Sequence, residues 1–165
     1  MLITQLLKGN IVEALCCAAA ILLALMFHEL SHAYVAYLFG DTTAQQYGRL
    51  SLNPLKHLDP WGTLMIVLVG FGWAKSVPIN PFRFRKFKLG TIAVSLAGPF
   101  ANFILAFISL ILLTFTLGIS IVTSLFVYLI IINIGLGVFN LIPIPPWTGQ
   151  RCCSHCCRGR RMSSF

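Results

Sequence analysis

The residues best suited to chemistry in this sequence are His28, Glu29 and His32, which form the pattern His-Glu-x-x-His. On a helix, residues four positions apart lie on one face, so both imidazoles can reach one metal ion with Glu29 beside them. Neutral imidazole nitrogens are zinc ligands, and a catalytic zinc site keeps one position for water. Glu29 can then accept a proton from that water and pass it to a leaving amine. The pattern predicts a hydrolytic zinc centre.

Two other interpretations of the same pattern remain open. A pair of buried histidines is often satisfied by neighbouring polar groups without any metal, and histidines inside a membrane can also form the transit site of a metal-ion transporter. The surroundings favour the zinc centre, because the motif lies within an almost continuous apolar run, where ionisable groups are costly and usually functional. The glutamate between the two histidines disfavours a transporter.

The composition places the motif in a membrane protein. The 165 residues are 58% hydrophobic and only 10% charged, whereas soluble domains are about half apolar and about a quarter charged. Too few polar side chains are present to cover a folded surface, which excludes an ordinary soluble enzyme. A hydrolytic centre inside the lipid bilayer indicates a protease that cuts the transmembrane or juxtamembrane segment of a membrane-anchored protein. The substrate helix must partly unwind first, because its peptide carbonyls are already hydrogen-bonded.

Three apolar stretches are long enough to cross a bilayer, namely residues 11–39, 91–117 and 119–142. The first is about 40 Å long as a helix, against a hydrocarbon core of about 30 Å. Residues 61–73 form a shorter apolar run of about 20 Å, which we expect to be re-entrant. Residues 49–52 alternate like a short strand. The expected fold is therefore an all-α polytopic membrane protein, with a three-helix catalytic core, a re-entrant segment and a small β-element.

The distribution of charge predicts the orientation of these spans. The formal net charge is +8, and five basic residues lie in the loop 74–90: Lys75, Arg83, Arg85, Lys86 and Lys88. The positive-inside rule makes this loop cytoplasmic. We therefore expect a multi-pass membrane protein, with the His-Glu-x-x-His motif toward the cytoplasm. A basic protein can bind nucleic acid, but no nucleic-acid-binding fold is recognisable, so no such partner is expected.

Further stretches resemble the site-2 protease family of intramembrane zinc metalloproteases, specifically its compact bacterial branch without a PDZ domain. The resemblance covers about residues 11–146 and is carried, beyond the first motif, by residues 48–62, 71–81, 97–102 and 140–146. It implies that His28 and His32 hold Zn²⁺ and that Glu29 is the general base. It also implies that Asn140, on the last core helix, helps to hold substrate, and that the membrane is the bacterial plasma membrane.

Three other polar residues have less specific expectations. Asn102 and Asn133 are expected to form interhelical hydrogen bonds, as asparagines in membrane helices commonly do. His57 either supports or gates the site or is a surface histidine beside Lys56.

The resemblance stops at the third zinc ligand. After Pro146 the family has Leu-Asp-Gly, whose aspartate completes the zinc site, but this chain has Trp147-Thr148-Gly149. A neutral hydroxyl is a poor zinc ligand beside a carboxylate, so weak metal binding is expected. The alternative function is an inactive pseudoprotease that binds membrane substrates without cutting them. We expect an incomplete metalloprotease core over residues 1–146, followed by an aberrant, disordered, basic and cysteine-rich tail over residues 147–165.

The tail is compatible with a shifted reading frame. A tryptophan codon read one base earlier can encode leucine, and the next triplet then encodes aspartate because threonine codons begin with AC. Arginine and cysteine are also frequent in out-of-frame GC-rich DNA, and the tail holds four of each. The competing interpretation is a metal-binding or palmitoylated tail, in which His155 replaces the missing aspartate.

We predict that the codons for residues 144–165, read one base earlier from about Pro146, encode Leu-Asp-Gly followed by an apolar stretch. Resequencing the gene measures this directly. Codons that cannot encode Leu-Asp-Gly in that frame would contradict the hypothesis and favour a genuine tail.

Overall fold

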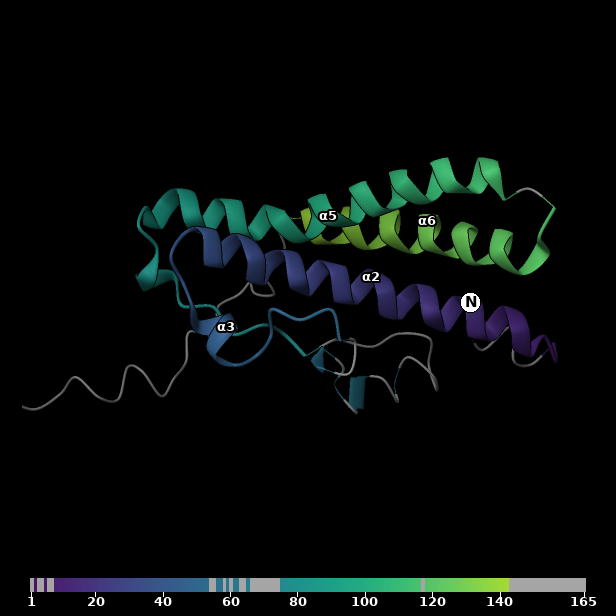
Figure 1. Cartoon of the computed structure of the whole chain (residues 1–165), viewed down its shortest axis with the longest axis horizontal. Coiled ribbons are helices and arrows are strands. Elements are labelled where there is room, and N and C mark those ends of the chain that lie inside the picture. The colour runs from purple at the N-terminus through teal and green to yellow at the C-terminus, as the bar shows by residue number, and fades with distance from the viewer. Residues whose placement is uncertain are drawn as a thin grey trace, which may run out of the picture.

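Three long helices form the bulk of the protein in the computed structural model, which describes residues 2, 5, 8–53, 56–57, 59, 61–62, 65, 75–116 and 118–142. They are α2 (Ile11–Leu38), α5 (Phe87–Phe115) and α6 (Ser120–Leu141). Each packs against the other two in an elongated bundle (Figure 1). All three are long and apolar enough to cross a membrane. The three predicted spans and the helical fold class are confirmed.

Small side chains on α2 let the helices approach one another. Ala20 and Ala36 are fully buried on this helix, Ala20 in a cluster with Tyr128 and Leu129 of α6, and Ala36 in a cluster with Val94 of α5. Without a hydrophobic driving force between helices in lipid, close packing of small residues is a main source of association. Cys17 belongs to the same cluster as Ala20. The cysteine therefore behaves as a small hydrophobic residue, as is usual for a buried thiol.

Helices α5 and α6 also meet through a small residue. Gly137 of α6 faces Phe103 of α5, and a Cβ atom added to this glycine would lie 3.0 Å from the Phe103 Cζ atom. Gly135, two residues earlier, has nothing within 4 Å of such an added atom. The ring of Phe103 thus occupies the space that a side chain at position 137 would need.

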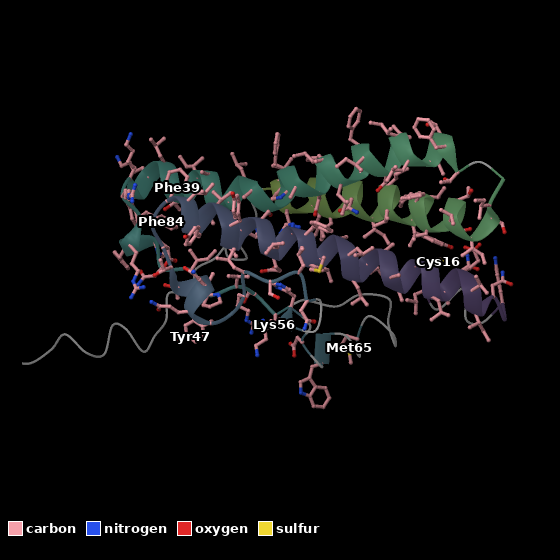
Figure 2. All side chains as sticks on the ribbon, in the orientation of Figure 1. Cys16, Phe39, Tyr47, Lys56, Met65 and Phe84 are labelled. Atoms are coloured by element: carbon pink, nitrogen blue, oxygen red, sulfur yellow. The ribbon has the colours of Figure 1, made fainter. Side chains whose placement is uncertain are left out.

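The connection from α2 to α5 folds back onto the C-terminal end of α2. Gly40 ends that helix with φ 102, a left-handed conformation that favours glycine. The backbone N–H of Arg85 donates to the Phe39 carbonyl over 3.0 Å. The rings of Phe39 and Phe84 lie 6.2 Å apart, and Figure 2 shows them together at one end of the bundle, with Cys16 toward the other. The basic end of the loop is therefore attached to the C-terminal end of α2.

Asp41 joins the two short helical elements of this connection, α3 (Thr43–Gln46) and η2 (Pro81–Arg83). Its side chain is 1% exposed and accepts hydrogen bonds from the backbone N–H of Thr43 over 3.0 Å and of Asn80 over 2.6 Å. A buried carboxylate with several hydrogen-bond donors is a strong local constraint. Asp41 thereby holds segment 75–80 alongside α2.

The predicted strand at residues 49–52 is wrong, since this segment is irregular and the described part of the chain contains no strand. The backbone groups here are used locally. The Ser51 carbonyl accepts from His57 Nε2 over 2.8 Å, and the Asn53 N–H donates to Ser51 Oγ over 3.3 Å. A strand pairs these groups with a neighbouring strand instead.

Two predictions fall mainly outside the described residues. The re-entrant segment falls largely on residues 63–64 and 66–73. The boundary at Pro146 and the tail beyond it fall within residues 143–165.

We predict that Gly137→Leu destabilises the bundle by about 1–3 kcal/mol, the usual cost of overpacking, because Phe103 must move. Gly135→Leu is the matched control, with the same change of helix propensity but open space around it. Thermal unfolding of both variants in the same detergent measures the difference. Equal melting temperatures would contradict the close contact between α5 and α6.

Candidate metal centre

The two motif histidines converge on one point. His28 and His32 lie on successive turns of α2, and their Nε2 atoms are 3.1 Å apart. The rings meet edge to face with centroids 4.7 Å apart, and His28 is 7% exposed. Two nitrogen ligands at about 2.0–2.1 Å from a tetrahedral zinc ion lie about 3.3 Å from each other. The observed separation fits a shared metal ion.

His32 is held in a tautomer that can bind a metal. Its Nδ1 lies 2.6 Å from the carbonyl oxygen of Val94 on α5. Because a carbonyl only accepts hydrogen bonds, Nδ1 carries the proton and donates it, which leaves a lone pair on Nε2 of the neutral ring. Metal-ligating histidines usually make this type of bond with their second ring nitrogen. Helix α5 therefore orients His32.

His28 is held from the same helix by Asn102. The side-chain nitrogen of Asn102 lies 3.1 Å from His28 Nδ1, and Asn102 is fully buried. The interhelical hydrogen bond predicted for this asparagine is confirmed, and its partner is a candidate metal ligand. Asn133 differs from the prediction, because its side-chain amide donates to the Leu129 carbonyl of its own helix. No interhelical hydrogen bond is found for it among the described residues of the three long helices.

Gly98 provides the space in front of the two rings. A Cβ atom at this position of α5 would lie 2.4 Å from His32 Nε2 and 2.7 Å from His28 Nε2. Real Cβ atoms essentially never approach so closely, so a side chain at this position would force the two rings to move. The absence of a side chain leaves room beside both nitrogens. The arrangement of His28, His32 and Gly98 thus fits a metal ion.

Glu29 faces segment 75–80, which lies along α2. Its Oε2 atom accepts a hydrogen bond from the backbone N–H of Val77 over 3.1 Å. Val77 is itself buried against Ala33 and Ala44. The carboxylate is consequently held by the backbone of a segment far away in sequence.

His57 supports this covering segment. It is 2% exposed, which excludes a surface histidine, and its Nε2 donates to the Ser51 carbonyl. Its backbone carbonyl accepts from the N–H of Lys75 over 2.9 Å, at the start of segment 75–80. His57 therefore acts on the loop and makes no described contact with the histidine pair.

The structure does not bring Asn140 to the histidines. Its side chain donates to the Leu136 carbonyl of its own helix over 2.8 Å, and no described contact joins it to His28 or His32. Within the described ranges, no group of three His, Cys, Asp or Glu side chains could hold a metal. Position 148, where the family has its third ligand, lies outside those ranges. The described site therefore consists of two candidate nitrogen ligands, with the Glu29 carboxylate next to them in sequence as the candidate base.

Comparison with known proteins gives a consistent result. Residues 16–124 match the family described as peptidase family M50. The chain is 46% identical over 143 residues to a protein of Bacillus subtilis named "Putative zinc metalloprotease YwhC", covering 79% of this chain and 64% of the relative. It is 33% identical over 138 residues to "Putative zinc metalloprotease Rip2" of Mycolicibacterium smegmatis, covering 78% and 52%. The chain thus spans about half to two thirds of these relatives. No solved structure matches it significantly.

We predict that Gly98→Ala weakens Zn²⁺ binding by at least tenfold, because the added methyl group occupies the space beside both Nε2 atoms. Competition with a chromophoric chelator in detergent measures the affinity. Gly135→Ala is the control, since it makes the same change at an open helical position. Unchanged zinc affinity in Gly98→Ala would contradict a metal ion between these two rings.

Proposed function

We propose that this chain, which belongs to peptidase family M50, is a zinc-dependent intramembrane endopeptidase that cleaves transmembrane or juxtamembrane segments of membrane-anchored proteins. One observation carries the proposal. The converging nitrogens of His28 and His32, with Glu29 between them in sequence, lie inside a helix that is long and apolar enough to cross a membrane. A hydrolytic site within such a helix would act on proteins whose peptide chain lies in or next to the bilayer.

His28 and His32 are the residues that would hold the metal, through their Nε2 atoms. The chemistry that zinc supplies at such a site is Lewis acidity, which makes water a better nucleophile and a peptide carbonyl a better electrophile. Val94 and Asn102 keep the two rings in place through their Nδ1 atoms. Little rearrangement of the side chains is then needed during the reaction, which is the advantage of a preorganised site.

Glu29 is the proton carrier in this proposal. Its carboxylate accepts a proton from the attacking water and delivers it to the amine nitrogen of the scissile peptide as that bond breaks. The Val77 N–H holds one carboxylate oxygen, so the carboxylate has a defined orientation. Segment 75–80 also limits the access of bulk water, which strengthens electrostatic interactions within the site.

The substrate is proposed to enter in an extended form. A peptide carbonyl within a helix is already hydrogen-bonded, so the scissile segment must unwind before water can attack it. The bilayer helps to select the substrate, since only a segment within or next to the membrane can reach the centre. Asn140 remains the proposed substrate-holding residue from the family resemblance.

The active site is proposed to open toward the cytoplasm. His28 lies ten residues before Leu38, the last residue of α2, which corresponds to about 15 Å along the helix. The basic loop is attached to this same end through the hydrogen bond from Arg85 to Phe39. The positive-inside rule puts such a loop on the cytoplasmic side.

A pseudoprotease is the second candidate, and Thr148 is the observation that favours it. Two histidines without a third protein ligand bind zinc less tightly and leave its geometry less defined. Such a protein would still bind membrane segments but would not cut them.

We predict that Glu29→Gln lowers cleavage of a membrane-anchored reporter by about 10²–10⁴-fold, because the amide cannot accept the proton. The amide oxygen can still accept from the Val77 N–H, so the fold is expected to remain intact. Glu13→Gln is the matched control on the same helix, where the carboxylate accepts from Ser124 Oγ over 2.6 Å, far from the histidines. Product formation in proteoliposomes, with and without a chelator, gives the rates.

Each outcome of this assay has one interpretation. Equal cleavage by the unmodified chain and Glu29→Gln would overturn the assignment of the base. If the unmodified chain does not cut, but Thr148→Asp with Leu-Asp-Gly restored does, the chain is a pseudoprotease with an otherwise competent site. If neither form cuts, the proposed endopeptidase activity is wrong.

A further inference from the structure

A group of exposed basic side chains lies where α2 ends and α5 begins. We call it the basic cluster, and its members are Arg83, Arg85, Lys86 and Lys88. Among the described residues, none of the four side chains forms an ion pair or a hydrogen bond. The first turn of α5 contains no acidic residue, and Asp41 is buried with its carboxylate bonded to Thr43 and Asn80. The positive charge of the cluster is therefore not neutralised by the protein.

The backbone that carries the cluster is fixed by a buried ring. Phe84 is 8% exposed and packs against Ala36 of α2 and Val94 of α5. Gly90 makes room for it, since a Cβ atom at that position would lie 2.7 Å from Phe84 Cδ2. Figure 2 shows Phe84 beside Phe39 at one end of the bundle, with side-chain nitrogen atoms (blue) around them. The basic cluster is thus a positioned part of the surface.

Two exposed aromatic rings adjoin the cluster. Phe82 is 80% exposed and Phe87 is 52% exposed, and their ring centroids lie 6.1 Å apart. Aromatic rings next to basic side chains are typical of the membrane–water interface, where the rings lie at the level of the lipid headgroups. A free phosphate ion offers these rings nothing to pack against, whereas a phospholipid does.

The lengths of the helices place this surface at the depth of the headgroups. Helix α2 has 28 residues and α5 has 29, which correspond to about 42 and 43 Å along the helix axis. The hydrocarbon core is about 30 Å thick, and the bilayer with its polar headgroup regions is about 40–45 Å thick. Both helices are long enough to reach the headgroups, and the Arg85 N–H bond to the Phe39 carbonyl joins their ends here.

We propose that the basic cluster binds the headgroups of anionic phospholipids, with the rings of Phe82 and Phe87 packed against the adjoining part of the lipid. An arginine guanidinium can bind two phosphate oxygens at once, and a lysine ammonium acts as a point charge. A zwitterionic lipid carries its own cation next to the phosphate, so it offsets part of this attraction. Binding of this kind needs neither a metal ion nor proteolysis, and it therefore goes beyond the proposed function.

A variant with three substitutions in the cluster tests this role. It combines Arg83→Gln, Lys86→Gln and Lys88→Gln. Arg85 is kept, because its side chain packs on Gly40, with Cγ 3.5 Å from where a Cβ atom of that glycine would be. The three replaced side chains are exposed, so the fold is expected to remain intact.

A matched control removes the same number of positive charges elsewhere. It combines Lys8→Gln, Lys56→Gln and Lys75→Gln, which are also exposed. Figure 2 shows Lys56 away from the end of the bundle at which Phe39 and Phe84 lie. A difference between the two variants therefore reports the position of the charges and not their sum.

The first measurement is lipid binding to the purified full chain in detergent, by native mass spectrometry. The probes are phosphatidylglycerol and phosphatidylcholine with identical acyl chains. We expect the unmodified chain to bind phosphatidylglycerol about tenfold more tightly than phosphatidylcholine, since each basic group near an anionic headgroup favours binding. The cluster variant should lose most of this preference, and the control variant should keep it within about twofold.

Two results of this measurement would overturn the proposal. Equal binding of the two lipids by the unmodified chain would leave an acidic protein segment as the alternative partner of the cluster. Equal losses in both variants would show that only the total charge matters. If the cluster variant does not fold, Lys88→Gln is compared with Lys75→Gln in the same way.

The second measurement distinguishes a lipid site from a site for any phosphate. Phosphatidylglycerol should raise the melting temperature of the unmodified chain and of the control variant more than that of the cluster variant, because a ligand that binds only the folded state stabilises it. Inorganic phosphate at the same concentration should neither raise the melting temperature nor displace the bound lipid. Displacement by inorganic phosphate, or equal stabilisation of all three proteins by phosphatidylglycerol, would contradict a lipid site at the cluster.

Discussion

Helix α5 can reach the two histidines of α2 because residue 98 is a glycine. A single methyl group there would lie within 2.4 Å of His32 Nε2, so the contact between these helices and the space beside the rings depend on the same missing side chain. From this contact α5 presents Val94 on one side and Asn102 on the other, and each binds one imidazole. In an apolar medium a buried polar group without a partner is costly, which makes these bonds strong constraints on how the helices align.

The second constraint is the pair of carboxylates that hold segment 75–80. Asp41 and Glu29 are twelve residues apart on α2 and the turn that follows it, and they accept from the backbone of Asn80 and Val77 respectively. The loop is therefore attached at two points along the helix. A charged group buried in this way contributes only while its partners stay in place, so Glu29 is both a candidate base and a part of the structure.

The chemistry and the membrane are linked by this arrangement. The C-terminal half of α2 carries the candidate metal-binding nitrogens and the candidate base, and its end is attached to the basic loop. Membership in peptidase family M50 agrees with that combination. Helix α5 fixes the two histidines through Val94 and Asn102. Segment 75–80 fixes Glu29 through the backbone N–H of Val77.

Local periodicity and composition were sufficient to predict the three spans and the His-Glu-x-x-His face, because both depend only on helical geometry and on the apolar character of successive residues. The strand at residues 49–52 could not be predicted correctly, since its alternation was local whereas the Ser51 carbonyl is taken by His57. Asn102 looked in the sequence like any buried asparagine, and only the packing of α5 on α2 distinguishes it from Asn133. The sequence by itself thus determined which residues can do chemistry and which helix carries them. The tertiary structure decided which partners orient them, because those hydrogen bonds join residues 48 to 74 positions apart, and no local pattern records such distances.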